Sequence, residues 1–526
     1  MVWDAKILVG HAGSSLIHRA PLPPGQPTSH VDRVTLARVG DILMRPMDRP
    51  NESGGHAALT VACAVFLTSL RLLKPEANRP LLYALGMIAL LLGGCSSYGV
   101  VQNTAGPVAQ DKPSYSLRQF EQRWRTDDNA LMLAFSGGGT RAAALAYGVL
   151  KELRDTPVVS SGVSGRMLDE VHSISSVSGG SFTAAYYGLY GDGIFEDFED
   201  VFLRQNIEGA LLHRLLNPFR WFGTTGRTEM AVDYYEKTVF QGATFADLLR
   251  QGGPLIAINA SDFAYGVRFS FVQEYFDLLC SDLSSFPVAR AVTASSAVPV
   301  LFNPVVVENY PDCGAEVPDW LQAARHRAVN DAELAMTVEG LESYFDRDQR
   351  HYVHFVDGGI TDNLGLRALY DVTEIQGGIK KFNEGYLRQP PRRFILISVN
   401  ASTDAESKMD STTKQPPLKE AISAVSDVQL HRYNAATIAL MQRTLARWAQ
   451  EMSTPDRPVD AYFILLDLQG IEDQEFRDFL NAAPTSFSLT DEQVDGLIAA
   501  GAELLRNHPE FRRLLSDVAA DGQLNP

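Results

Sequence analysis

The sequence has few cysteines and a deficit of positive charge. Among its 526 residues are 4 cysteines, and 46 lysines and arginines stand against 63 aspartates and glutamates, which gives a formal net charge of −17 at pH 7. This balance argues against nucleic acid as a partner, because binding to a polyanion depends on basic residues. It also argues against broad electrostatic docking on anionic lipid, so membrane contact has to come from an anchor and an apolar surface.

Several site signals are absent as well. The sequence contains no internal repeat, low-complexity tract, metal-ligand cluster or GxxxxGK[ST] phosphate loop. We therefore expect no metal and no other cofactor, calcium included. Cys63 and Cys95 lie near the N-terminus, which leaves Cys280 and Cys313 for the folded part. This second pair is either a disulfide or two buried thiols, because the sequence gives no distance between them.

The most informative stretch is LMLAFSGGGTRAAALAYGVLKEL, residues 131–153. Its first five residues predict a buried strand, and apolar residues at helical spacing predict a helix over its second half. The turn between them consists of Gly137, Gly138 and Gly139. Main-chain N–H groups are accessible there at a helix N-terminus, so the turn predicts a site for an anion or for a developing negative charge.

Two chemical classes use such a turn. Gly137, Gly139 and Ala142 fit the dinucleotide pattern GxGxxG/A. That pattern also needs an acidic residue at the end of the next strand, about 20 residues on, and none occurs around Pro157. The other class is an oxyanion hole, which predicts a nucleophile on a second turn nearby.

The segment VHSISSVSGGSFTAAYYGLYG, residues 171–191, contains a candidate nucleophile. It again predicts a strand, a sharp turn and a helix, with Ser178 at the bend. A nucleophile elbow G-x-S-x-G has small residues on both sides of such a serine. Here the small residues are Ser176, Gly179 and Gly180. Ser176 replaces the first glycine of the motif, which departs from the pattern but keeps a small side chain.

The segment HYVHFVDGGITDNLGLRALYDV, residues 351–372, supplies a candidate base. A short alternating run predicts a strand that ends at Asp357, where a carboxylate can reach a serine across the sheet edge. Asp-Gly is also common in turns for backbone reasons alone. A histidine base in the usual chain order has to follow Asp357, and only His431 and His508 do so. His431 lies in a predicted helix, where a packed or solvated role is expected.

Together these motifs resemble the patatin-like phospholipases, and SGGGTR is similar to the loop of the related cytosolic phospholipase A group. ASSAVPVLFNPV, residues 294–305, resembles the family's serine/proline block, and the likeness covers roughly residues 129–375. It implies an α/β fold, a three-layer α/β/α sandwich with a mostly parallel central sheet, a nucleophile elbow and a helical C-terminal extension. It also implies Ser178 as nucleophile, Asp357 as its base, and the amides of residues 137–139 as oxyanion donors.

The resemblance implies hydrolysis of acyl esters in membrane phospholipid or lysophospholipid. Arg141 follows the glycines and either steadies their loop, meets a substrate phosphate, or pairs with a neighbouring acid at the helix start. Two other functions stay open. One is a non-catalytic envelope lipoprotein of this fold that binds lipid or acts as a scaffold. The other is a thioesterase or peptidase that uses the same dyad.

The segment RPLLYALGMIALLLGGCSS, residues 79–97, indicates where in the cell the protein is located. Its apolar run is short for a transmembrane helix and ends at Cys95, which resembles a bacterial lipoprotein signal with lipid added to that cysteine. Ser96 follows the cysteine and, by resemblance, favours the outer membrane. We therefore expect a lipid-anchored protein of the bacterial cell envelope, on the periplasmic side of the outer membrane.

These expectations divide the chain into five parts. Residues 1–78 do not fit a signal peptide, and a start at Leu72 or Leu73 gives a leader of the expected form. The other parts are the signal at 79–95, a linker at 96–128, the catalytic domain at 129–375 and, at 376–526, strands and helices that complete the same domain.

Five further segments are predicted. Residues 210–227 combine apolar and aromatic side chains with three arginines, so they form either a membrane-facing lid or part of the core. Residues 394–402 and 461–468 read as buried strands. Residues 418–451 and 490–516 read as helices.

Overall fold

The structure, a computed structural model, describes residues 99–106, 113–121, 129–160, 163–210, 226–299, 301–311, 313, 316–386, 390–403, 413, 415 and 417–524. All of them belong to one compact unit, Cys95–Pro526. The expected lipoprotein signal, Cys95 itself and residues 211–225 of the lid segment lie outside the described residues.

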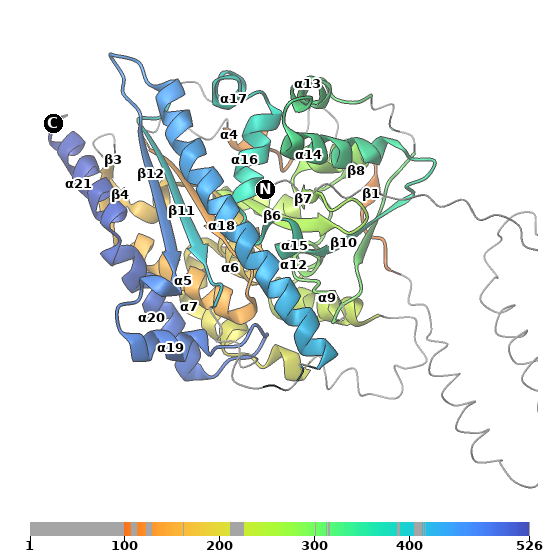
Figure 1. Ribbon diagram of the computed structural model, residues 1–526, viewed down its shortest axis with the longest axis horizontal. Coiled ribbons are helices and arrows are strands. Elements are labelled where there is room, and N and C mark those ends of the chain that lie inside the picture. Colours follow the sequence, from red (N-terminus) through yellow and green to blue (C-terminus); the bar gives the residue numbers. More distant parts are fainter. Residues whose placement is uncertain are drawn as a thin grey trace, which may run out of the picture. The chain divides into compact units, whose positions relative to one another are not determined.

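A mostly parallel sheet of eight strands forms the centre (Figure 1). Its order is β12-β11-β2-β5-β6-β10-β9, and β7 also pairs with β6. The strands are β2 (Asn129–Phe135), β5 (Val171–Val177), β6 (Leu255–Asp262), β7 (Arg268–Ser270), β9 (Val305–Glu308), β10 (Tyr352–Asp357), β11 (Arg393–Asn400) and β12 (Asp460–Asp467). The strands from β12 to β6 run parallel, while β7, β10 and β9 are antiparallel to their neighbours.

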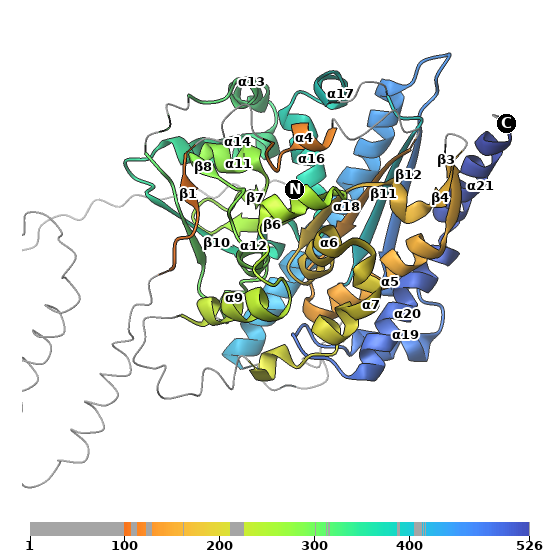
Figure 2. The same cartoon turned by 180° about the vertical axis from the view of Figure 1, so that it is seen from behind.

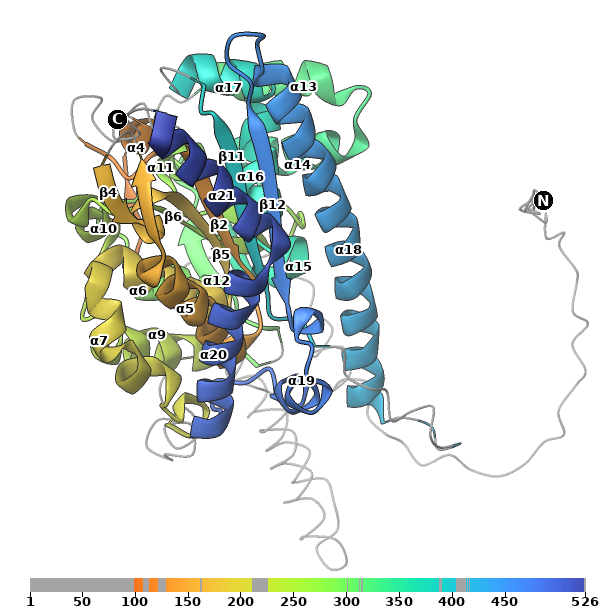
Figure 3. The same cartoon turned by 90° about the vertical axis from the view of Figure 1, so that its left-hand side faces the viewer.

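Helices cover both faces of this sheet, and Figure 3 shows it between them. One face carries α5 (Gly139–Asp155), α6 (Gly179–Tyr190), α20 (Asp491–Asn507) and α21 (Pro509–Leu524). The other face carries α16 (Leu366–Ile375), α17 (Ile379–Tyr386) and α18 (Leu418–Met452). Leu133 of β2 belongs to the core beneath α5, whereas its neighbour Ala134 belongs to the core that contains Trp448 of α18. Strands covered on both faces are apolar along most of their length, as β2 is, and the predicted three-layer α/β/α sandwich is confirmed.

The remaining elements surround this sandwich. The helices are α4 (Leu117–Glu121), α7 (Ile194–Phe198), α9 (Arg227–Thr238), α10 (Phe245–Gln251), α11 (Gln273–Leu278), α12 (Val288–Ser295), α13 (Asp319–Ala328), α14 (Ala332–Glu342), α15 (Gly359–Asp362) and α19 (Gln474–Asn481). Two short strand pairs are β1 (Thr104–Ala105) with β8 (Ser281–Asp282), and β3 (Pro157–Ser160) with β4 (Val163–Arg166).

Two expectations about segments differ from the structure. The helix predicted over 490–516 is two helices, because Pro509 favours an extended conformation at His508, whose φ and ψ are −64° and 125°. The predicted linker contains docked residues: Tyr115 is buried, and its hydroxyl donates to the Ile256 carbonyl and accepts from the Ile256 amide. Its glycine- and proline-rich composition is typical of a linker, but the buried aromatic residues Tyr115 and Phe120 and the strand pairing by β1 hold it on the domain.

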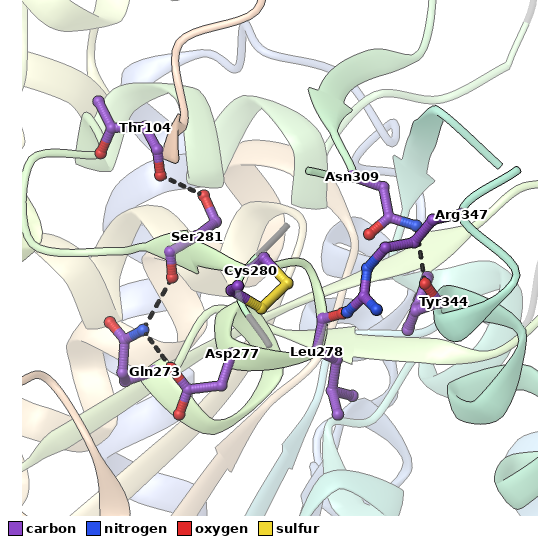
Figure 4. The surroundings of a disulfide bond; sticks show 10 residues. Thr104, Gln273, Asp277, Leu278, Cys280, Ser281, Asn309, Tyr344 and Arg347 are labelled. Atoms are coloured by element: carbon purple, nitrogen blue, oxygen red, sulfur yellow. Dashed lines mark hydrogen bonds between the residues drawn. A yellow bond between two sulfur atoms is a disulfide. The ribbon is translucent and has the colours of Figure 1, made fainter. Parts of the chain in front are cut away.

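Cys280 and Cys313 form a disulfide with their Cα atoms 5.5 Å apart (Figure 4). The sequence leaves open whether these cysteines form a disulfide or are two buried thiols, and the structure has the disulfide. The bond ties the residue before β8 to the chain that follows β9, so it closes the antiparallel end of the fold.

Candidate active site

Ser178 is the single residue between β5 and α6. Its φ of 49° is one of few positive values at a non-glycine residue in the described chain, and such a conformation is strained. The turn requires glycine at the next position, because a Cβ on Gly179 would lie 2.0 Å from the carbonyl oxygen of Gly139. The main-chain N–H of Gly180 donates to the Ser136 carbonyl at 3.2 Å, which joins the turn to the end of β2.

Ser176 occupies the place of the first motif glycine without disturbing this turn. Its side chain is fully buried, and its hydroxyl donates to the Ala257 carbonyl of β6 at 3.3 Å. A hydroxyl of this size therefore fits between two parallel strands, and the departure from the motif is accommodated.

Asp357 lies at the end of β10, with β6 between that strand and β5. Ser178 Oγ donates to Asp357 Oδ2 at 2.8 Å, and the Gly359 N–H donates to Oδ1 at 2.7 Å. Burial raises the pKa of Asp357 to about 6, and the hydrogen bonds from Gly359 and Ser178 oppose that rise. The structure thus brings the two predicted residues into contact and makes the carboxylate a stronger base than an exposed aspartate.

The glycine loop differs in one detail from the sequence-based expectation. The Gly137 N–H donates to the Asn363 carbonyl at 2.9 Å, so it is not available as an oxyanion donor in this conformation. Gly138 has a positive φ of 139°, a conformation that glycine adopts readily. Within the described chain, the N–H groups of Gly138, Gly139 and Gly179 have no protein acceptor. Gly179 enters this set because it begins α6 directly after the serine.

Arg141 is buried, and its guanidinium donates to oxygen atoms of distant segments. It donates to the carbonyls of Ala401 and Ala483 at 2.8 and 2.6 Å, and to the Thr485 hydroxyl at 3.0 Å. Burial lowers the pKa of Arg141 to about 10, so the side chain stays charged at neutral pH. These contacts join the start of α5 to Ala401, which follows β11, and to residues 483–485, and they fit the first of the three roles open from the sequence.

Ser295 is a positioning residue that the sequence reasoning missed. Its hydroxyl accepts from the Ser178 N–H at 2.8 Å and donates to the Asn259 carbonyl at 2.6 Å. Its own carbonyl accepts from the Gly358 N–H at 3.0 Å, next to Asp357. The end of α12 therefore holds both candidate residues, and the signal that could have found it is the serine/proline block at 294–305.

A pocket of about 330 Å³ contains Ser178. Its apolar lining consists of Met230, Val298, Leu301, Phe302 and Phe487. The exposed charged side chains Glu208 and Arg227 also line it. A separate cavity of about 120 Å³ lies under α16 and α18, on the opposite face of the sheet, and contains neither Ser178 nor Asp357.

Within the described residues, no group of three or more histidine, cysteine, aspartate or glutamate side chains is arranged to hold a metal ion. Among the described helices, none combines the length and the apolar character that crossing a membrane requires.

Residues 133–370 match the family model described as Patatin-like phospholipase. No curated protein is found to match the chain. Among solved structures, human GIVD cytosolic phospholipase A2 is similar at 12% identity and a TM-score of 0.38, over 82% of this chain and 69% of that chain. The same human protein in complex with methyl gamma-linolenyl fluorophosphonate is similar at 11% identity and a TM-score of 0.34, over 82% of this chain and 70% of that chain.

Proposed function

The chain carries a patatin-like phospholipase domain, that of a lipid acyl hydrolase, over residues 133–370, and we propose that it cleaves phospholipid or lysophospholipid acyl esters with Ser178 and Asp357. The observation that carries this proposal is the 2.8 Å hydrogen bond from Ser178 Oγ to Asp357 Oδ2, on a serine that lines a largely apolar pocket. A serine hydroxyl is a weak nucleophile until a base accepts its proton.

In the first step, Ser178 Oγ attacks the ester carbonyl carbon while Asp357 accepts the hydroxyl proton. The raised pKa of this buried carboxylate supports that role, because a base with a pKa nearer the working pH accepts a proton more readily. The ester C–O bond then breaks, and Asp357 returns the proton to the leaving alkoxide. A water molecule repeats both steps on the acyl-enzyme and releases the fatty acid.

Negative charge develops on the carbonyl oxygen during each attack. The N–H groups of Gly138, Gly139 and Gly179 are the donors available for it, and α5 and α6 both begin at this point. Two helix N-termini that meet at one place favour a negative charge there. A single well-placed donor contributes roughly 3 kcal/mol to such a transition state.

The pocket composition supports an amphipathic substrate. Apolar side chains such as Met230 and Phe302 fit an acyl chain, and the exposed Arg227 suits an anionic group outside it. Phe487 comes from the C-terminal part of the chain and covers one side of the same pocket.

For location, we propose that lipid on Cys95 holds the protein at the periplasmic side of a bacterial outer membrane. The lipoprotein-like sequence that ends at Cys95 supports this. The Cys280–Cys313 disulfide supports an oxidising compartment, because disulfides persist there and are rare in the cytosol.

Labelling with a fluorophosphonate ester, followed by mass mapping of the modified peptide, tests the proposal. We expect the label on Ser178, hydrolysis of phospholipid or lysophospholipid, and loss of both in the Ser178→Ala variant. A folded protein that neither takes the label nor hydrolyses an ester would favour the non-catalytic lipid-binding role. Labelling at Ser178 with turnover of thioesters or peptides alone would favour the thioesterase or peptidase alternative.

A further inference from the structure

The first described residues of the chain run along the edge strand β9. Gly99 lies so close to it that a Cβ there would be 2.3 Å from the Val306 side chain. Asn103 pairs with Glu308 in both directions: its Nδ2 donates to the Glu308 carbonyl at 2.8 Å, and its Oδ1 accepts from the Glu308 N–H at 2.9 Å. These contacts fix the path by which the chain enters the domain.

A buried charged cluster holds the same segment at the start of α9. Arg290 is 1% exposed and donates to both carboxylate oxygens of Glu229, at 2.9 and 2.6 Å. It also donates to Gln102 Oε1 and, at 3.1 Å, to the Val100 carbonyl. The Val100 N–H donates to Glu229 at 3.4 Å. Because this arginine is buried and fully engaged, residues 100–102 are bound in place.

This attachment point lies beside the pocket that contains Ser178. Glu229 stands between Arg227 and Met230, which both line that pocket. The hydroxyl of Thr228 donates to the Asn303 carbonyl at 2.6 Å, next to another lining residue, Phe302. The chain thus enters the domain next to the pocket, a path that runs between β1 and α9 in Figures 1 and 2.

The pocket also carries apolar side chains that reach solvent. Leu301 is 61% exposed and Val298 is 37% exposed, and both line it. Exposed apolar residues around a pocket are typical of a surface that meets lipid. In a chain with a net charge of −17, such residues provide membrane contact that does not depend on attraction to anionic lipid.

We propose that this rim, defined by Arg227, Val298 and Leu301, faces the bilayer to which the chain is attached at Cys95. The inference rests on the proposed lipid anchor and acyl hydrolase function. Gly99 follows Cys95 by four residues, and four extended residues span at most about 14 Å. Since residues 100–102 are bound beside the pocket, the anchor holds the rim at the lipid surface.

Spin labelling of single introduced cysteines tests this orientation. Cys280 and Cys313 are in a disulfide, the proposed cleavage before Cys95 removes Cys63, and the proposed lipid blocks Cys95, so Leu301→Cys provides one reactive thiol. Val329→Cys is the matched control, because Val329 is 80% exposed and follows α13, which lies at the opposite end of the domain from α9 (Figures 1 and 2). Both changes are made in Ser178→Ala protein, so that no lipid is consumed.

The labelled proteins are isolated from the membrane fraction and reconstituted into vesicles of phosphatidylethanolamine and phosphatidylglycerol. We expect the nitroxide at 301 to collide about fivefold less with a water-soluble nickel chelate than the nitroxide at 329, and more with oxygen, as for a side chain within the acyl boundary. Equal accessibility at the two positions, or absence of the protein from membranes, would overturn the inference.

This readout is separate from the test of the proposed function. A membrane-buried label at 301, together with no ester hydrolysis by the protein that keeps Ser178, would support the orientation and contradict the hydrolase. A water-exposed label, together with ester hydrolysis by the protein that keeps Ser178, would refute the orientation alone.

Discussion

Arg141 donates to the carbonyl of Ala483 at 2.6 Å, across a sequence separation of 342 residues. The neighbouring Thr140 N–H donates to the Ser486 carbonyl at 2.9 Å. These bonds hold residues 483–487 against the glycine loop. Three of those residues, Thr485, Ser486 and Phe487, line the pocket. The site therefore depends on chain well beyond the residues that match the family model.

Arg141→Met is expected to lower activity on all esters to the same degree. The change removes two hydrogen bonds to the segment 483–487 and one to the Ala401 carbonyl, and a misplaced oxyanion loop reduces rate by roughly 100-fold. The measurement is kcat/KM on a phospholipid and on an uncharged short-chain ester. A loss confined to the phospholipid would show instead that this arginine meets the substrate phosphate.

Arg227→Gln is expected to lower activity on phospholipid but not on the uncharged ester. Arg227 is an exposed cation of the pocket, and a hydrogen bond to a charged group contributes about 1.5–3 kcal/mol when protected from water and less when exposed. We expect up to about tenfold lower kcat/KM on phospholipid, no change on the uncharged ester, and partial retention by Arg227→Lys. Glu208→Gln is the matched control of opposite charge, and it should leave phospholipid hydrolysis unchanged or raise it. Equal losses on both substrates would contradict headgroup recognition.

The local parts of this architecture could be predicted from the sequence. The strand–turn–helix units at 131–153 and 171–191 follow from apolar runs and glycine turns that act within a few residues. Helical periodicity likewise predicts α18 to within one residue. Such features depend on short-range sterics and burial, which a single sequence records directly.

The long-range parts could not be predicted in this way. Nothing in the local sequence shows that β6 lies between β5, which leads to Ser178, and β10, which ends at Asp357. Nor does it show that the Ser295 hydroxyl accepts from the Ser178 N–H. The engagement of the Gly137 N–H by Asn363 also arises from a contact between distant segments. Strand order and such contacts follow from the packing of the whole domain, so the motif order along the chain was the available signal for the site.

The disulfide is expected to stabilise the domain without serving the chemistry. Cys280→Ser together with Cys313→Ser opens a loop with a sequence separation of 33, which costs about 3–4 kcal/mol by loop entropy. Thermal unfolding of the double variant should therefore occur several degrees lower, while kcat on a soluble ester at 25 °C stays unchanged. A lost turnover in protein that is still folded would assign the bond a role in the site.

Gly179→Ala is expected to abolish hydrolysis. A Cβ at this position would lie 2.0 Å from the carbonyl oxygen of Gly139, so the turn and the glycine loop have to separate. Moving a donor away from the oxyanion costs about 100-fold or more in kcat. Gly385→Ala is the matched control, because nothing lies within 4 Å of a Cβ there. Comparable activity of the two variants would show that the close approach is not needed.

The acidic limb of the pH–rate profile should report Asp357. Because the base has to be ionised and burial raises its pKa to about 6, kcat/KM on a soluble ester should fall below about pH 6 and level off above it. Asp357→Asn keeps the shape of the side chain but cannot take the proton, so a loss of roughly 10³-fold or more is expected. An acidic limb near pH 4 would show that the carboxylate is not desolvated in the working enzyme.

The same substitution should make the protein more stable at neutral pH. The pKa of Asp357 is higher in the folded state, about 6, than in the unfolded chain, about 4. The folded state thus binds the proton more tightly, and stability falls as pH rises from about 4 to 6, by on the order of 2–3 kcal/mol. Asp357→Asn removes this loss and can still accept the Gly359 N–H. Melting temperatures of the two proteins should therefore coincide near pH 4, and the variant should melt higher above pH 7. A variant that melts lower at every pH would mean that the ionised carboxylate stabilises the fold.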